Sequence, residues 1–237
     1  MAQKQCYNCG KLFENRDLTK EHIPPKCFSD VYSDEFKMNR LTVPCCNDCN
    51  NNLSKTDTYL RDVIAIVKDG RDGNAEFLRK AMKSVLDDKS GNVSKTFDHN
   101  GLRVSMSTDV IDETFLKCHK GLFYDKYGYA IDGEFDTKVF SKLVGEAYNN
   151  PLNQVLRGIH MSRRDLWKIS GHEDIFFGSL LPIKQNGDKW EIAENLEEAF
   201  AVCSLMGFHG LVEAVGISVR KGHHLHPEAI RQRKEMN

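Results

Sequence analysis

The chain has 237 residues, of which 40% are hydrophobic and 28% are charged. This composition is typical of a globular protein with room for a small module beside one larger core. No segment approaches the roughly 18 consecutive apolar residues of a membrane span, and the first residues lack the apolar region of a secretory signal. We therefore expect a cytoplasmic protein without a membrane partner, in which thiols stay reduced and paired cysteines usually bind metal.

The net charge of −1 argues against a wide electrostatic surface for nucleic acid, because proteins that rely on such a surface are usually basic. Any nucleic-acid contact must then be local. The basic residues around the first motifs are Lys11, Arg16, Lys20, Lys26, Arg61 and Lys68. The stretch 220–234 is also basic and rich in histidine, and a solvated C-terminal helix explains it at least as well as a DNA contact.

Two C-x-x-C pairs lie within the first fifty residues: Cys6 with Cys9, and Cys46 with Cys49. Four thiolates are the number and type of ligand that a closed tetrahedral zinc site requires. Cys45 makes the second pair ambiguous by one position, and the C-x-x-C spacing to Cys49 selects Cys46. The simpler alternative is a zinc ribbon without catalysis, and disulfides are less favoured still. The other cysteines, Cys27, Cys118 and Cys203, have apolar or amphipathic neighbours and are expected to be buried small hydrophobes.

Residues of a different chemical type accompany the cysteine pairs. Glu21 and His22 lie between the pairs and are followed by two prolines, and Asn50 comes directly after the last cysteine. Carboxylate and amide oxygens suit a hard divalent cation, and an imidazole is mostly neutral at pH 7 and can act as a base. A purely structural zinc site needs none of these groups. Taken alone, His22 is also compatible with a surface histidine or a zinc ligand, and Asn50 with a helix N-cap.

The segments C-Y-N-C, T-K-E-H-I-P-P and L-T-V-P-C-C-N-D-C-N-N-N-L-S-K together resemble the HNH, or ββα-metal, endonuclease family. The resemblance covers roughly residues 1 to 60, about a quarter of the chain. It implies a hairpin whose first strand carries the acid–histidine pair, followed by a helix that completes a catalytic metal site.

The resemblance implies a role for each motif residue. Cys6, Cys9, Cys46 and Cys49 would hold a structural Zn²⁺. His22 would be the general base, and Glu21 and Asn50 would ligate a catalytic Mg²⁺ or another divalent metal. The family more often has Asp at the position of Glu21. Its loop asparagine should fall near Leu41 and Thr42, and Asn39 is out of register with that position.

The sequence after the motifs predicts mostly helices, then mostly strands. A helix begun at Asn50 should continue to Val67, a break should span 68–74, and a second helix should cover Ala75 to Leu86. Residues 102–106 alternate like a short strand. The segment from Val110 to Tyr124 predicts a helix that buries Ile111, Phe115, Cys118 and Leu122, with His119 as a packing residue rather than a ligand. Phe135 to Tyr148 is expected to form a further helix.

The last third is β-like. Strands are predicted at 175–182, 189–192, 199–206 and 211–219, with hairpin turns at 186–188 and 207–210. We therefore expect an α+β protein with two parts: a zinc-stabilised ββα-metal (treble-clef) nuclease module over 1–68, and an α+β accessory domain over 75–237 in which helices pack on a small antiparallel sheet.

These observations favour a metal-dependent HNH endonuclease that hydrolyses DNA phosphodiester bonds and leaves a 5′-phosphate. The alternative is a zinc-stabilised nucleic-acid- or protein-binding module whose catalytic site is vestigial. A nuclease that prefers RNA or single strands would share the same site. Homodimerisation, or a partner protein from a defence or mobile-element system, would involve the C-terminal domain.

Overall fold

The computed structural model describes residues 3–29, 38–52, 54–67, 75–89, 91, 93–99, 101–131, 133–143, 151–173, 175–187 and 189–223. Within these residues the chain is a mixed α+β protein whose strand pairs are all antiparallel, which confirms the predicted fold class at that level.

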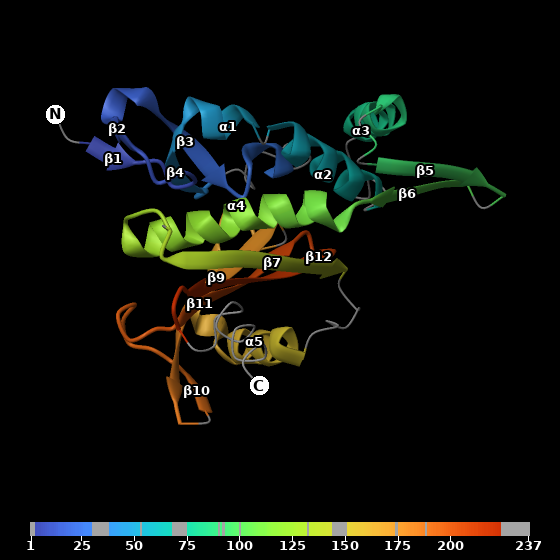
Figure 1. Ribbon diagram of the computed structural model, residues 1–237. Coiled ribbons are helices and arrows are strands. Elements are labelled where there is room, and N and C mark those ends of the chain that lie inside the picture. The colour runs from blue at the N-terminus through green and yellow to red at the C-terminus, as the bar shows by residue number, and fades with distance from the viewer. Residues whose placement is uncertain are drawn as a thin grey trace, which may run out of the picture.

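Two short hairpins and a helix form the N-terminal part (Figure 1). Strand β1 (Gln3–Gln5) pairs with β2 (Leu12–Glu14), and β3 (Leu18–Ile23) pairs with β4 (Leu41–Cys46). Helix α1 (Asn47–Asn52) follows β4 directly. The order of a hairpin strand carrying Glu21 and His22, a return strand and a helix therefore agrees with the sequence prediction.

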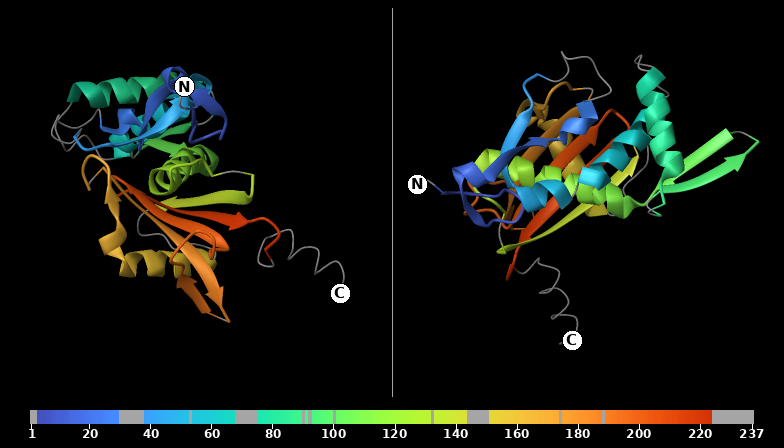
Figure 2. Two further views of the ribbon diagram at one scale, coloured as in Figure 1. Left: turned by 90° about the vertical axis from the view of Figure 1, so that its left-hand side faces the viewer. Right: turned by 90° about the horizontal axis from the view of Figure 1, so that it is seen from above.

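The next segments are mainly helical. Helix α2 (Ser54–Val67) follows α1, and α3 (Ala75–Asp87) has nearly the predicted bounds. Strands β5 (Val93–Asp98) and β6 (Gly101–Met106) form a hairpin that extends away from the body of the molecule (Figures 1 and 2). The sequence predicted β6 and did not predict its partner β5.

Helix α4 (Thr108–Tyr127) is the central element. The side chain of Ser107 caps its first turn, and Gly128 ends it with a left-handed backbone (φ 80°), as is usual at helix C-termini. The predicted residues Phe115, Cys118 and Leu122 are buried, and Ile111 is half-buried. The helix lies between the N-terminal hairpin and the large sheet (Figures 1 and 2).

The large sheet has the strand order β10-β9-β11-β12-β7, and β8 pairs with β9. Its strands are β7 (Phe135–Leu143), β8 (Lys168–Ile169), β9 (Phe176–Asn186), β10 (Lys189–Ile192), β11 (Ala201–Phe208) and β12 (Val212–Arg220). Helix α4 covers one face, and α5 (Pro151–Ser162), which the sequence did not predict, covers the other (Figure 1). Because both faces are covered, every residue of β11 is buried.

The helix predicted over Phe135 to Tyr148 is wrong. Residues Phe135–Leu143 form strand β7, which pairs with β12 along its full length from Phe135↔Arg220 to Leu143↔Val212. Phe135 and Val139 are spaced for one face of a helix, but they also lie on one face of a strand, and both are buried there. Pairing with β12, which is distant in sequence, decides in favour of the strand over the helix. Residues 144–148 lie outside the described part of the chain.

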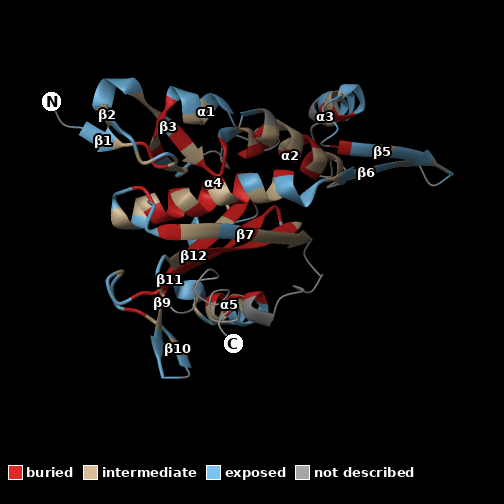
Figure 3. Cartoon of the chain, in the orientation of Figure 1, coloured by how far each residue is buried: buried red, intermediate tan, exposed pale blue. Residues whose placement is uncertain are grey.

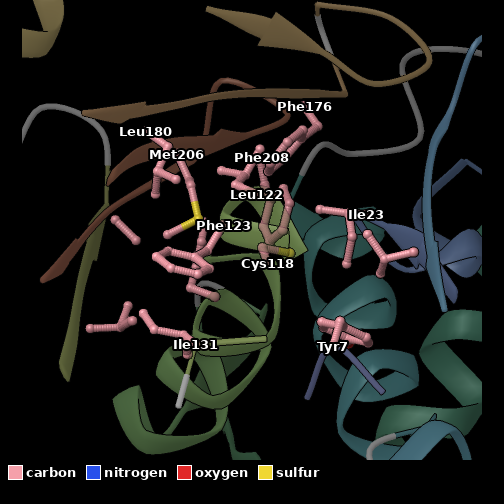
Figure 4. Close-up of a cluster of buried hydrophobic side chains, with 14 of the residues drawn as sticks. Tyr7, Ile23, Cys118, Leu122, Phe123, Ile131, Phe176, Leu180, Met206 and Phe208 are labelled. Atoms are coloured by element: carbon pink, nitrogen blue, oxygen red, sulfur yellow. The ribbon is translucent and has the colours of Figure 1, made fainter. Parts of the chain in front are cut away.

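One hydrophobic core joins the N-terminal hairpin, α4 and the large sheet (Figure 4). Phe28 and Phe115 both stack on Phe208 of β11. The ring centroid of Phe208 lies 4.9 Å from that of Phe28 and 4.3 Å from that of Phe115. A second cluster under α5 contains Leu156, Leu181 and Leu205. Figure 3 shows buried residues concentrated along α4 and the sheet, whereas the β5–β6 hairpin is largely exposed.

None of the helices in the described ranges has the length and apolar character needed to cross a bilayer.

Candidate metal centre and nuclease-like hairpin

The two predicted cysteine pairs converge on one point. The sulfur atoms of Cys6, Cys9, Cys46 and Cys49 all lie within 4.8 Å of one another, and Cys9 Sγ is 4.0 Å from Cys46 Sγ. Four thiolates at zinc–sulfur distances of about 2.3 Å in a tetrahedron are about 3.8 Å apart. The cluster therefore fits a tetrahedral metal such as zinc, and the choice of Cys46 over Cys45 is confirmed.

The first cysteine pair lies on a turn that a backbone hydrogen bond closes. The amide of Gly10, whose φ is 71°, donates to the Cys6 carbonyl at 2.9 Å. From the other pair, the amide of Cys46 donates to Cys6 Sγ at 3.4 Å. Amide donors directed at a sulfur favour its thiolate form, which is the form that binds metal. The Cys45 thiol, followed by backbone amides, lowers the pKa of Cys6 to about 3.

Helix α4 supplies a cation to this centre. Lys120 Nζ donates to both the backbone carbonyl and the Oδ1 of Asn8, which lies between the first two cysteines, at 3.2 Å and 3.0 Å. Burial lowers the pKa of Lys120, and the charges of Cys49, Cys6 and Cys9 oppose that shift. A Zn²⁺ with four thiolates has a net charge of −2, so an ammonium at this position is electrostatically complementary.

The remaining cysteines are not among the four that converge, although the Cys45 thiol is hydrogen-bonded to Cys6 and so adjoins them. Cys45, Cys118 and Cys203 are buried and Cys27 is half-buried, as expected for small apolar side chains. None of these remaining cysteines forms a disulfide.

His22 lies on the hairpin strand β3 with its ring half-buried. Its cross-strand partner is Thr42, so the two side chains share one face of the hairpin. Burial lowers the pKa of His22, and the charges of Arg40 and Lys26 lower it further. The imidazole is therefore neutral at pH 7, the state that a general base requires. Its Nδ1 is buried and has no hydrogen-bond partner among the described residues.

A cleft of about 500 Å³ adjoins this face of the hairpin. Arg40 and Thr42 line it from the hairpin, Asp125 lines it from α4, and Lys168 and Ser170 line it from β8 and the residue after β8; Lys168 is paired with Asp125. Asn39, in the turn before β4, also lines the cleft and has a left-handed backbone with φ 53°. The charges that act on His22 are thus those of two cations, Arg40 and Lys26, and its cross-strand neighbour Thr42 lines the cleft.

Glu21 points to the other face of β3, because successive strand residues alternate. Its side chain is 9% exposed, and its Oε1 lies 2.6 Å from Lys117 Nζ. The same ammonium lies 2.8 Å from Asp57 Oδ2, and Thr114 Oγ1 donates to Asp57 Oδ1 at 3.3 Å. Burial raises the pKa of both carboxyl groups, and Lys117 opposes that shift.

Asn50 lies inside α1, which begins at Asn47, so Asn50 is not the N-cap. Its Nδ2 donates to Thr19 Oγ1 at 3.1 Å, and Thr19 in turn donates to the Cys45 carbonyl at 3.0 Å. Thr19 is two residues before Glu21, so Asn50 approaches the face of β3 that carries Glu21. His22 occupies the opposite face.

The predicted catalytic metal site does not fit this arrangement at Glu21. A Mg²⁺ ion held by one or two protein oxygens keeps several waters, which needs open space around the carboxylate. Glu21 is instead enclosed, and its oxygen is bonded to a fixed ammonium group. The structure thus brings Glu21 together with Lys117 and Asp57, and it separates Glu21 from the face of His22.

Sequence reasoning missed Lys117, Asp57 and Arg40. A signal for Lys117 was present, because Thr114, Lys117 and Gly121 follow helical spacing beside the apolar stripe of α4 and form a second face of small or polar residues. That face packs against β3. No sequence pattern marked Asp57 or Arg40. Asp57 pairs with Lys117, which is distant in sequence, and Arg40 lies outside the motifs.

Comparison of the chain with protein-family models, with curated proteins and with solved structures finds no match.

Proposed function

We propose that this chain hydrolyses phosphodiester bonds in nucleic acid, with His22 as the general base on a zinc-held hairpin of the HNH, treble-clef type. The observation that carries the proposal is the setting of His22: a neutral, half-buried imidazole near Arg40 and Lys26, whose cross-strand neighbour Thr42 lines a cleft. The cysteine cluster supports it by joining the turn between β1 and β2 to α1 and to the end of β4, the strand that pairs with the histidine's strand.

The chemistry assigned to His22 is removal of a proton from a water molecule as its oxygen attacks phosphorus. The bond between phosphorus and the 3′ oxygen then breaks, the leaving oxygen takes a proton from solvent, and a 5′-phosphate remains. Negative charge builds on the phosphoryl oxygens in the transition state, and preorganised cations stabilise it. Arg40 and Lys26 are the cations whose charges act on His22, so they are the residues assigned to that role.

The family resemblance also implies a divalent ion that would stabilise the same charge. The resemblance assigns Asn50 and Glu21 to that ion, but Asn50 bonds to Thr19 on the face of β3 opposite His22 and Glu21 is enclosed by Lys117, so neither residue supports an ion beside His22. The proposed partner is DNA, in the cytoplasm, where free thiols of the kind found here persist.

The test is cleavage of plasmid DNA and of labelled single-stranded DNA and RNA by the purified chain, with Mg²⁺, Mn²⁺ or Ni²⁺ and with EDTA. His22→Ala should lose about two to four orders of magnitude in rate, the usual contribution of general-base catalysis. Thr42→Ala is the matched control, since it alters the cross-strand neighbour and keeps the imidazole. Equal activity of wild type and His22→Ala, at equal zinc content, would refute the mechanism.

A second candidate is a zinc-stabilised nucleic-acid- or protein-binding module with a vestigial site. The ion pair of Lys117 with Glu21 favours it, because that pair neutralises the predicted acidic ligand. This candidate predicts DNA or protein binding that is unchanged in His22→Ala and no cleavage by wild type with any of the three metals.

A further inference from the structure

We infer that Glu21 binds the ammonium group of Lys117 as its cation, in place of the divalent metal ion that the family resemblance implies. The inference concerns a different face of the hairpin from His22 and does not depend on the chain being a nuclease.

Three separate elements meet at this ammonium. Glu21 comes from β3, Asp57 from α2 and Lys117 from α4. The Nζ atom lies 2.6 Å from Glu21 Oε1 and 2.8 Å from Asp57 Oδ2, which are distances of charge-assisted hydrogen bonds. The three side chains are between 1% and 9% exposed. The cation that the two carboxylates bind at this junction of three elements is thus supplied by the chain itself.

The charges favour retention of the proton on Lys117. Burial acts to lower its pKa, but Asp57 and Glu21 outweigh burial and raise the pKa above its ordinary value. Removing one partner from a buried ion pair leaves an uncompensated charge and is strongly destabilising. Two carboxylates share one ammonium here, so the loss of Lys117 would leave two buried negative charges facing each other.

The close approach of α4 to β3 makes this contact possible. Gly121 lies one turn after Lys117, and a Cβ atom at Gly121 would be 2.4 Å from Ile23 Cγ1 of β3. The absence of a side chain therefore allows the helix backbone to approach the strand that carries Glu21. Little space is left between α4 and β3 for a divalent ion that keeps several water ligands. The ammonium group of Lys117 fits there without bound water.

The test is Mn²⁺ binding to the zinc-loaded full chain, followed by electron paramagnetic resonance, with thermal unfolding in the presence and absence of millimolar Mn²⁺. In the wild-type background, Glu21→Gln should leave Mn²⁺ affinity unchanged, because Lys117 already occupies the carboxylate. Lys117→Ala should gain one Mn²⁺ site, with affinity at least about tenfold above wild type, and its unfolding temperature should rise with Mn²⁺. Adding Glu21→Gln to Lys117→Ala should abolish the gain.

The comparison of wild type with Glu21→Gln is decisive even if Lys117→Ala does not fold. A fall in Mn²⁺ affinity in Glu21→Gln would show that Glu21 binds a divalent ion despite Lys117, and would overturn the inference. A folded Lys117→Ala protein without a new Mn²⁺ site would also overturn it. The neutral triple variant Lys117→Met, Glu21→Gln, Asp57→Asn is the control for packing, and its stability should not respond to Mn²⁺. Because these readouts are ion binding and stability, they are independent of whether the chain cleaves nucleic acid.

Discussion

Phe28 and Phe208 stack with ring centroids 4.9 Å apart and an interplanar angle of 19°. Phe28 follows the strand that carries Glu21 and His22, and Phe208 ends strand β11 of the large sheet. Both rings are fully buried. Apolar contacts therefore join the β3–β4 hairpin, beside the cysteine cluster, to the C-terminal sheet. They cross the boundary that the sequence predicted between residues 68 and 75.

The first prediction follows from this shared core and concerns unfolding of the zinc-loaded chain. Zinc release, followed with a chromophoric chelator, should coincide with the change in tryptophan fluorescence. The two signals report different parts of the chain, because both tryptophans, Trp167 and Trp190, lie in the C-terminal half. A structural Zn²⁺ contributes on the order of ten kcal/mol in zinc-finger peptides, so Cys49→Ser should lose zinc and several kcal/mol of stability.

Cys27→Ser is the matched control, because Cys27 forms no disulfide and is not one of the four clustered cysteines. It should retain one zinc per chain. Two separated transitions in the wild type would contradict a shared core.

A second prediction compares two helical glycines. Gly121→Ala should destabilise the protein by about 1–3 kcal/mol, the usual cost of overpacking, because the added Cβ would lie 2.4 Å from Ile23 Cγ1. Gly158→Ala on α5 is the control. Nothing lies within 4 Å of its added Cβ, so the higher helix propensity of alanine should stabilise the chain by up to about 1 kcal/mol. Urea denaturation midpoints would measure both, and a stabilising Gly121→Ala would show that α4 can move away from β3.

The sequence predicted the parts of this protein that depend on local spacing. The two C-x-x-C pairs, the hairpin strand with Glu21 and His22, and helix α4 all follow from residues close together in the chain. The Phe135–Leu143 strand was missed because its spacing also suits a helix and its partner, β12, is distant in sequence. The partner of Glu21 could not be predicted for the same reason, because Lys117 lies in another element that is distant in sequence. Spacing predicts which residues share an element, but it does not predict which elements meet.

The third prediction concerns stability in acid. Burial lowers the pKa of His119 and His160 to about 3, with nearby cationic groups as minor causes. His119 lies between the hydroxyl groups of Ser204 and Ser218, at 2.7 Å and 2.8 Å. In the unfolded chain a histidine binds its proton near pH 6.5. Stability is therefore fully present above about pH 6.5 and falls as the pH drops toward 3, by about 1.4 kcal/mol per pH unit for each histidine.

Urea denaturation between about pH 5 and 6.5 would measure this slope. His160→Gln should reduce the slope by about one proton, since it removes one buried neutral imidazole. His99→Gln is the control, because His99 is exposed on the β5–β6 hairpin. An unchanged slope in His160→Gln would show that His160 takes up its proton in the folded state.

The last prediction concerns the pH dependence of cleavage, and it rests on the proposed role of His22. A general base acts when it is unprotonated, so the rate should rise with pH and then level off. Burial, Arg40 and Lys26 all lower the pKa of His22, so the midpoint of the rise should lie below the ordinary histidine value of about 6.5. Arg40→Ala and Lys26→Ala should each move the midpoint upward, and each should also slow the plateau rate by removing a cation near the phosphate. Lys4→Ala on β1 is the control for a general loss of positive charge, and it should leave the midpoint in place. A midpoint above 6.5, or one that none of these variants moves, would mean that the titrating group is not His22.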